Sequence, residues 1–253
     1  MANRFFVKLL KRVLGVVVVV IAAGLVAIWF FDESKPSGVE GADADALARK
    51  MLTAINHEAW VKTGAVQWTF RGKNHHIWDR TQHIARVKWN DNEVFINLSD
   101  RTGMARTNGQ KAQGETLEKL LDSAWRRWAN DSFWLNPVSK IFDSGTRRSI
   151  VNLQNDEQAL LVEFTSGGVT PGDAYLWRID ENGLPKSWKM WVSMLPIGGL
   201  EATWENWLTL DTGVKVASSH KILFLELELT NIRAAETVEA LEIDGEFFAH
   251  AKN

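Results

Sequence analysis

The densest group of side chains that could perform chemistry is His75, His76, Asp79 and His83. Imidazole and carboxylate groups are the usual zinc ligands, so the group has the right composition for a metal site. In one extended strand His75, Asp79 and His83 would share a face, because alternate side chains point the same way. Residues four apart on a strand lie about 13 Å apart, however, which is too far for direct ligation of one ion. We therefore predict a solvated strand face here, and no metal site.

Other polar positions show no catalytic pattern. Asp79, Glu201 and Glu205 could act as acids or bases, but isolated carboxylates among 31 acidic residues are usually surface or ion-paired groups. The glycine-rich stretch at 166–173 lacks the lysine of a phosphate-binding loop and is typical of a long turn. The chain has no cysteine, which excludes disulfides and thiolate nucleophiles. We expect a protein that is not an enzyme and has no cofactor.

Tryptophan is the unusual feature of the composition, with 13 residues against one tyrosine. Indole rings bury a large apolar area, so they either fill a wide core or line an apolar groove. A groove of this kind binds an acyl chain by burial alone, at about 0.8 kcal/mol per methylene, and leaves no sequence motif. We expect these residues to line it: Trp68, Phe70, Trp78, Trp89, Phe95, Trp177, Trp188, Trp191, Trp204 and Trp207.

Two segments have the apolar period of an amphipathic helix. Leu47, Met51 and Ile55 recur at helical spacing, and Asp43 or Asp45 is the expected N-cap. A second helix is predicted at 116–128, where apolar residues form one face and charged residues the other. The sequence Asn-Asp-Ser at 130–132 is expected to end it.

Most of the remaining chain alternates apolar and polar residues, as Val66, Trp68 and Phe70 do with their neighbours. Strands are predicted at 60–71, 77–89, 93–98, 148–153, 159–164, 174–179, 188–192, 201–208 and 219–232, whereas the tail from Ala234 could be helix or strand. A sheet of about nine to eleven antiparallel strands must curl and needs cover on one face. The predicted fold class is α+β: a half-open antiparallel β-barrel covered by helices and preceded by one transmembrane helix.

The N-terminal segment predicts the organisation of the chain. Residues 13–31 carry no charge and are long enough to cross a bilayer, whereas a cleaved signal peptide has a shorter apolar region and a small-x-small site. Basic residues precede this stretch, so residues 1–12 are expected in the cytoplasm, 13–31 as a signal anchor in the lipid bilayer, and 32–43 as a linker. Residues 44–253 would form a periplasmic domain of a single-pass inner-membrane protein.

The order of these segments resembles the superfamily of the periplasmic lipoprotein carrier LolA and receptor LolB. The resemblance rests on a helix, a strand meander, the W-L-N-P segment at 134–143, Y-L-W-R-I-D at 175–180, the turn at 183–185 and G-G-L-E-A-x-W at 198–204. It implies an incomplete barrel whose apolar concave face holds acyl chains. The anchor departs from both family members, since the carrier is soluble and the receptor is anchored through cysteine.

Three functions follow from these observations. The first is a membrane-anchored binding protein that holds a lipid or lipoprotein acyl chain. The second is a non-catalytic structural or interaction module of an envelope complex, with a filled core and a protein partner. A hydrolase would need polar groups converging in a pocket, for instance around 75–83 or Glu201. Nucleic acid is not expected as a partner, because the net charge of −2 provides no basic patch.

Overall fold

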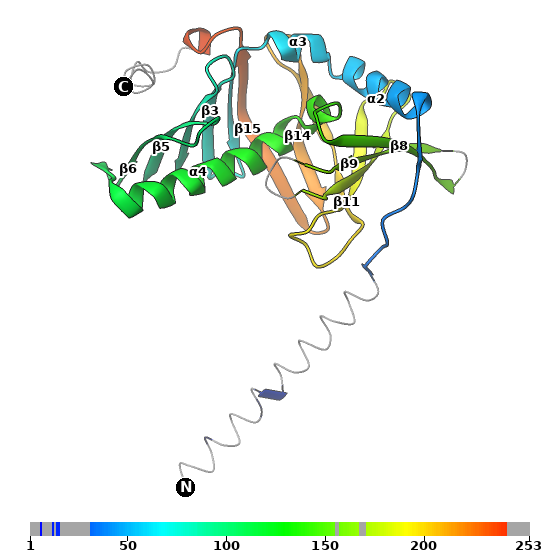
Figure 1. Ribbon diagram of the computed structural model, residues 1–253, viewed down its shortest axis with the longest axis horizontal. Helices are drawn as coiled ribbons and strands as arrows, with labels where there is room; N and C mark the ends of the chain where they lie inside the picture. Colours follow the sequence, from blue (N-terminus) through cyan, green and yellow to red (C-terminus); the bar gives the residue numbers. More distant parts are fainter. Residues whose placement is uncertain are drawn as a thin grey trace.

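The described part of the chain forms two antiparallel β-sheets with helices packed against them (Figure 1). The computed structural model describes residues 31–154, 157–166 and 171–241, together with Phe6, Arg12, Leu14 and Gly15. The first sheet has six strands in the order β1-β8-β9-β10-β11-β12. The second has nine, in the order β13-β14-β15-β2-β3-β4-β5-β6-β7.

The strands are short and joined mostly by tight turns. Those of the six-stranded sheet are β1 (Val39–Glu40), β8 (Thr146–Asn152), β9 (Gln158–Phe164), β10 (Ala174–Ile179), β11 (Pro185–Trp191) and β12 (Leu200–Thr203). Those of the nine-stranded sheet are β2 (Ala65–Phe70), β3 (Asn74–Asp79), β4 (Ile84–Trp89), β5 (Asn92–Asn97), β6 (Gly103–Thr107), β7 (Gln110–Lys111), β13 (Glu205–Thr209), β14 (Lys215–Ile222) and β15 (Leu225–Ala235).

The predicted half-open barrel is wrong, because the chain changes sheets at Trp204. Before it, Thr203 pairs with Ser187 of β11, and after it Glu205 pairs with Ser219 of β14. The backbone N–H of Trp204 still donates to Lys186 O of β11 at 2.8 Å. One predicted strand at 201–208 is therefore two strands in two sheets, and the sheets are not closed into a barrel.

Three α-helices pack on these sheets in the described residues. They are α2 (Ala42–Ala54), α3 (His57–Lys62) and α4 (Gly114–Leu135), and two short 3-10 turns, η1 (Pro137–Lys140) and η3 (Glu239–Leu241), accompany them. The N-cap of α2 is Gly41 and not an aspartate; Asp43 and Asp45 lie in its first turn, where they favour the helix dipole. Helix α4 runs through 130–132, where the sequence predicts its end, because Asp131 and Ser132 are buried against the sheet.

Two other predicted strands are hairpins. The stretch at 77–89 contains a turn, because Asp79 Oδ1 accepts the Gln82 N–H at 2.9 Å and His83 has a φ of 55°. The stretch at 219–232 turns at Leu223 and Phe224, so that Ile222 pairs with Leu225. The undecided tail continues β15 to Ala235 and ends, in the described residues, in η3.

The predicted membrane helix at 13–31 falls almost entirely outside the described residues, which include only Leu14, Gly15 and Phe31 of it. No helix in the described part of the chain has both the length and the apolarity needed to cross a membrane. This finding corrects the predicted single-pass localisation in the inner membrane.

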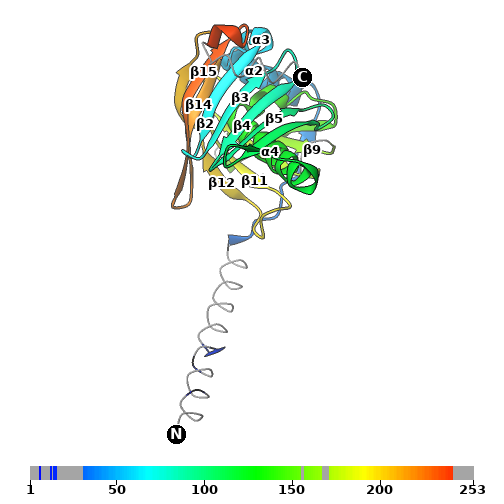
Figure 2. The same ribbon diagram turned by 90° about the vertical axis from the view of Figure 1, so that its left-hand side faces the viewer.

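Helix α4 and the second sheet form the layer that matters most for function. Figure 1 shows α4 crossing the nine-stranded sheet from β6 toward the junction with the six-stranded sheet. Figure 2, turned by 90°, shows the twist of the sheet and α4 packed on one of its faces. We call the face under α4 the inner face, and the opposite one the outer face.

Candidate functional site

Aromatic rings from both sheets and from the end of α4 meet at the sheet junction. Trp188 is central, with ring centroids 4.7 Å from Trp177, 5.0 Å from Trp204 and 5.1 Å from Trp134. Trp177 and Trp188 are cross-strand partners on β10 and β11, and Trp204 is the residue at which the chain changes sheets. We call Trp134, Trp177, Trp188 and Trp204 the junction cluster. Stacked and edge-to-face contacts at these distances stabilise aromatic groups beyond simple burial.

Buried indole nitrogens of the junction cluster and of the inner face under α4 are poor in hydrogen-bond partners. Six buried indole N–H groups have no hydrogen-bond acceptor among the described residues: those of Trp68, Trp78, Trp128, Trp177, Trp188 and Trp204. A buried tryptophan normally finds an acceptor for its N–H group, so these six groups keep an unused capacity to donate. The interior is therefore lined by apolar ring faces, and its indole N–H groups can still donate hydrogen bonds to an acceptor such as an ester carbonyl.

Helix α4 covers the inner face, and the strand residues packed under it are at most 6% exposed. Its apolar side carries Leu117, Leu121, Trp125 and Trp128, which pack on the sheet but are only partly buried. Ala124, at the closest approach, is fully buried. The opposite side of α4 carries exposed charged residues, so this helix can move away at a lower free-energy cost than one enclosed on all sides.

Polar groups fix the last third of α4 to the sheet. Asp131 Oδ2 accepts from Asn74 Nδ2 at 2.8 Å and lies 2.7 Å from His76 Nε2. Asn130 Nδ2 donates to Asp131 Oδ1 at 2.9 Å, and Arg127 Nη1 donates to Asn74 Oδ1 at 3.2 Å. The ring of His76 stacks on that of Trp68, 4.5 Å away. Burial lowers the pKa of His76 below its ordinary value, although Asp131 acts to raise it.

The ten predicted groove residues do not share one surface. Trp68, Phe70, Trp78 and Trp89 lie on the inner face of the nine-stranded sheet, as the cross-strand register requires. Trp177, Trp188, Trp204 and Trp207 belong to the core of the six-stranded sheet and the junction. Phe95 and Trp191 point the other way, into separate clusters on the outer faces of their sheets.

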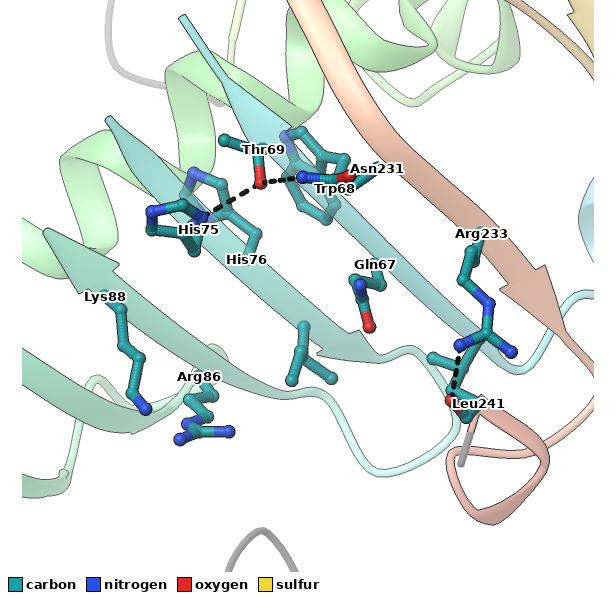
Figure 3. A pocket seen from close by; sticks show the side chains of 11 residues that line it. Gln67, Trp68, Thr69, His75, His76, Arg86, Lys88, Asn231, Arg233 and Leu241 are labelled. Carbon is teal, nitrogen blue, oxygen red and sulfur yellow. Dashed lines mark hydrogen bonds between the residues drawn. The ribbon is translucent and has the colours of Figure 1, made fainter. Parts of the chain in front are cut away.

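The outer face of the nine-stranded sheet carries an open pocket of about 400 Å³ that the sequence did not predict (Figure 3). Its polar wall is built around Thr69, whose hydroxyl contacts His75 Nδ1 at 3.0 Å and Asn231 Nδ2 at 3.4 Å. The register of β15 against β2 shifts between Thr230 and Arg233, so a β-bulge at this point places Asn231 beside Thr69.

Cationic side chains dominate the rest of this outer pocket. Arg86 and Lys88 lie on one side and Arg233 on the other, as Figure 3 shows. Glu93 neutralises part of this charge, with contacts of 2.5 Å to Arg86 and 3.0 Å to Lys88. Burial acts to raise the pKa of Glu93, but the hydrogen bonds from Lys88 and Arg86 outweigh it and lower that pKa. The pocket has the chemistry to hold an anionic group such as a phosphate.

The histidine-rich segment at 75–83 does not converge on one point. His75 faces the outer pocket, His76 is buried under α4, and His83 lies in the turn after β3. No group of three or more metal-ligating side chains comes together within the described residues.

The carboxylates that could act as acids or bases, and the arginine next to Asp79, form hydrogen bonds or ion pairs within the fold. Glu201 Oε1 accepts the Ser187 hydroxyl at 2.6 Å, and Glu205 forms an ion pair with Lys221 at 2.7 Å. Arg80, which follows Asp79, donates to the carbonyl groups of Trp60 and Thr63. These groups hold the fold together and do not face one another across a pocket.

Comparison with known proteins adds little to this description of the site. No protein-family model matches the sequence, and no curated protein matches it. Several solved structures match the fold, including the following two. One is a DUF1329 family protein from Desulfovibrio piger, with a TM-score of 0.42, 8% identity, and coverage of 83% of this chain and 98% of that chain. The other is a putative outer membrane lipoprotein-sorting protein domain from Vibrio parahaemolyticus, with a TM-score of 0.32, 9% identity, and coverage of 79% and 98%.

The second of these structures is named for lipoprotein sorting. Both TM-scores are below 0.5, so neither likeness carries an argument about what this chain binds.

Proposed function

We propose that this chain is a non-catalytic binding protein that holds an acyl chain of a lipid or lipoprotein against the junction cluster, under α4. The observation that carries the proposal is the set of unpartnered indole N–H groups in an otherwise apolar interior. An esterified acyl chain supplies what this interior lacks, because its methylenes suit the ring faces and its carbonyl oxygens accept hydrogen bonds.

Entry of such a ligand requires α4 to move. Trp134 near the end of α4 packs on both Trp188 and Trp204, so displacement of this helix opens the junction cluster directly. The bonds to Asp131 fix the C-terminal end of α4, whereas the apolar side of its N-terminal half is only partly buried. The N-terminal half of α4 can therefore lift at the lower cost, but a ligand reaches the junction cluster only when the bonds to Asp131 also break and Trp134 moves.

The test is native mass spectrometry of the purified full-length chain, followed by organic extraction of any bound lipid. We expect phospholipid or fatty acid close to one molecule per chain. Trp188→Phe keeps most of the ring and removes one indole N–H, so it should lower the amount of bound lipid several-fold. Trp191→Phe is the matched control, because Trp191 lies on the opposite face of β11 and its N–H already donates to Glu33 O at 2.6 Å.

A second function has its own supporting observation. Trp68, Trp177 and Trp188 are at most 1% exposed, so the interior is closely packed in this conformation. A packed interior suits an interaction module that binds a protein partner through its surface. A lipid-free mass, together with no uptake of a fluorescent fatty acid, would overturn lipid binding and leave this second function.

A further inference from the structure

The turn between β14 and β15 exposes two large apolar side chains. Ile222 and Leu225 are cross-strand partners, so Leu223 and Phe224 form a two-residue turn at the tip of the hairpin. Leu223 is 75% exposed and Phe224 is 89% exposed. Leu225, the next residue, is 49% exposed. The tip therefore presents apolar surface that the rest of the fold does not cover.

The fold does not need these residues at this turn. Leu223 has a φ of 52°, a conformation in which glycine or asparagine is favoured over a bulky side chain. The turn between β6 and β7 shows the ordinary solution, with Asn108 at 49° and Gly109 at 76°. Leucine in this position opposes both the backbone preference and the tendency of apolar groups to avoid water, which points to a role in binding.

A second apolar loop lies at the same end of the molecule. Met194, between β11 and β12, is 72% exposed, and Leu195 beside it is 38% exposed. Thr203 Oγ1 accepts the backbone N–H of Lys221 at 2.9 Å, and the strand that follows Thr203, β13, pairs antiparallel with β14. The loop before β12 and the turn after β14 therefore extend in the same direction. Figures 1 and 2 both show this loop and this turn at the lower end of the folded part. Phe31, 69% exposed, enters at this end, where Asp32 accepts from Gly198 N at 2.8 Å.

We propose that this end of the molecule docks on the surface of a lipid bilayer, with Leu223 and Phe224 inserted at the level of the headgroups. The apolar side chains stand on separate loop tips and do not form the continuous, closely packed patch of a protein interface. A bilayer accepts such side chains individually, without shape complementarity. The strand pairing continues to Ile222 and Leu225, so insertion leaves few backbone groups without hydrogen bonds.

Charged residues set the depth of insertion. Lys221 pairs in register with Glu226, and its Nζ lies 2.7 Å from Glu205. This layer is two residues behind the tip, or about 7 Å at the rise of a strand. Interfacial segments typically bury their apolar groups about 5–10 Å deep. The charged layer would therefore remain among the headgroups while the tip reaches the acyl boundary. The docking is independent of whether an acyl chain is bound at the junction cluster.

The chain has no cysteine, so a single introduced cysteine can be labelled selectively. Leu223→Cys in the full-length protein is labelled with an environment-sensitive fluorophore and mixed with phosphatidylcholine vesicles. We expect the emission to rise at least twofold and shift to the blue, and a spin-labelled lipid to quench it. Asn108→Cys is the matched control, because it also opens an exposed two-residue turn. Its label should respond neither to vesicles nor to the quencher.

A double variant separates docking from folding. Leu223→Gly with Phe224→Ser supplies the residues that this turn prefers and removes the apolar tip. A fluorophore attached through Met194→Cys in this background should lose most of its response to vesicles, whereas the thermal midpoint should stay equal or rise. Equal responses from labels at 223 and 108 would overturn the proposal. So would an emission change that follows protein concentration without vesicles, because the partner would then be a second copy of the chain. Loss of extracted lipid with an intact response at 223 would overturn only the proposed acyl-chain function.

Discussion

His76 Nε2 lies 2.7 Å from Asp131 Oδ2, and this contact joins β3 to the last third of α4. The two side chains come from positions 55 residues apart and are at most 2% exposed. A carboxylate this deeply buried is costly unless several donors surround it, and Asn74 and Asn130 supply two of them. The contact therefore fixes one end of the helix that covers the inner face.

Substitution of Asp131 by asparagine should destabilise the protein. The amide retains the shape but loses the charge-assisted bonds to Asn74 and His76, and the expected loss is roughly 1–3 kcal/mol of unfolding free energy. Urea denaturation followed by circular dichroism measures it. Asp122→Asn is the control, because Asp122 forms an exposed i,i+4 pair with Arg126. That variant should change stability by less than about 0.5 kcal/mol, and equal losses in both variants would contradict the prediction.

Stability should also depend on pH through His220. Burial lowers the pKa of His220 to about 4 in the folded state, although hydrogen bonds to the backbone of Thr203 and Trp134 and the charge of Glu205 act to raise it. The ordinary value of 6.5 applies in the unfolded chain, so the unfolded state binds more protons between these two values. The unfolding free energy should therefore fall as the pH is lowered from 6.5 toward 4, by up to about 1.4 kcal/mol per pH unit for this group.

The contribution of His220 is measured as a difference between two proteins. His220→Gln removes the titrating group, so denaturation curves across this pH range should show a shallower slope for the variant. Groups that do not interact with His220, including the other buried histidine, His76, are the same in both proteins, so their contributions cancel. A variant with the same slope as the original chain would show that His220 does not titrate in this way.

Local alternation predicted much of the strand content, but it could not show where strands break. The period of two continues through Trp204, although the pairing partner changes there from β11 to β14. Similarly, Leu223 and Phe224 read as the middle of a strand, because an apolar turn has no glycine, proline or asparagine to mark it. Pairing partners are non-local, so the two sheets could not be distinguished from one curled sheet.

The candidate site was predictable in its residue types and not in its grouping. The excess of tryptophan correctly indicated a region rich in buried rings, because indole is rarely placed on an exposed surface. Asp131 had no distinguishing signal, since its partners Asn74 and His76 lie on another element. The outer pocket depends on the bulge at Asn231, whose positive φ of 53° could have been suspected only from the tolerance of asparagine for that conformation.

Removal of the Trp204 side chain should loosen the joint between the sheets. Trp204 is 4% exposed and its ring lies 5.0 Å from Trp188 and 4.2 Å from His220. Trp204→Ala should cost roughly 3–5 kcal/mol of unfolding free energy, since the cavity cannot close between two sheets. Trp207→Ala, at a partly buried ring next to it, should cost clearly less. Chemical denaturation ranks the two variants, and the reverse order would contradict the role of Trp204.

Replacement of Glu93 should turn the outer pocket into a stronger anion site. Glu93→Gln frees Arg86 and Lys88 from their shared partner, so their charge becomes available to a phosphate. Any ligand that binds only the folded state raises its stability, so millimolar phosphate should raise the thermal midpoint of this variant more than that of the original chain. Glu115→Gln is the control, because it breaks the exposed pair with Lys119 on α4, away from the pocket. Equal phosphate shifts in the three proteins would show that the pocket does not bind anions, whereas a shift confined to Glu93→Gln would show that Glu93 occupies the position of the ligand.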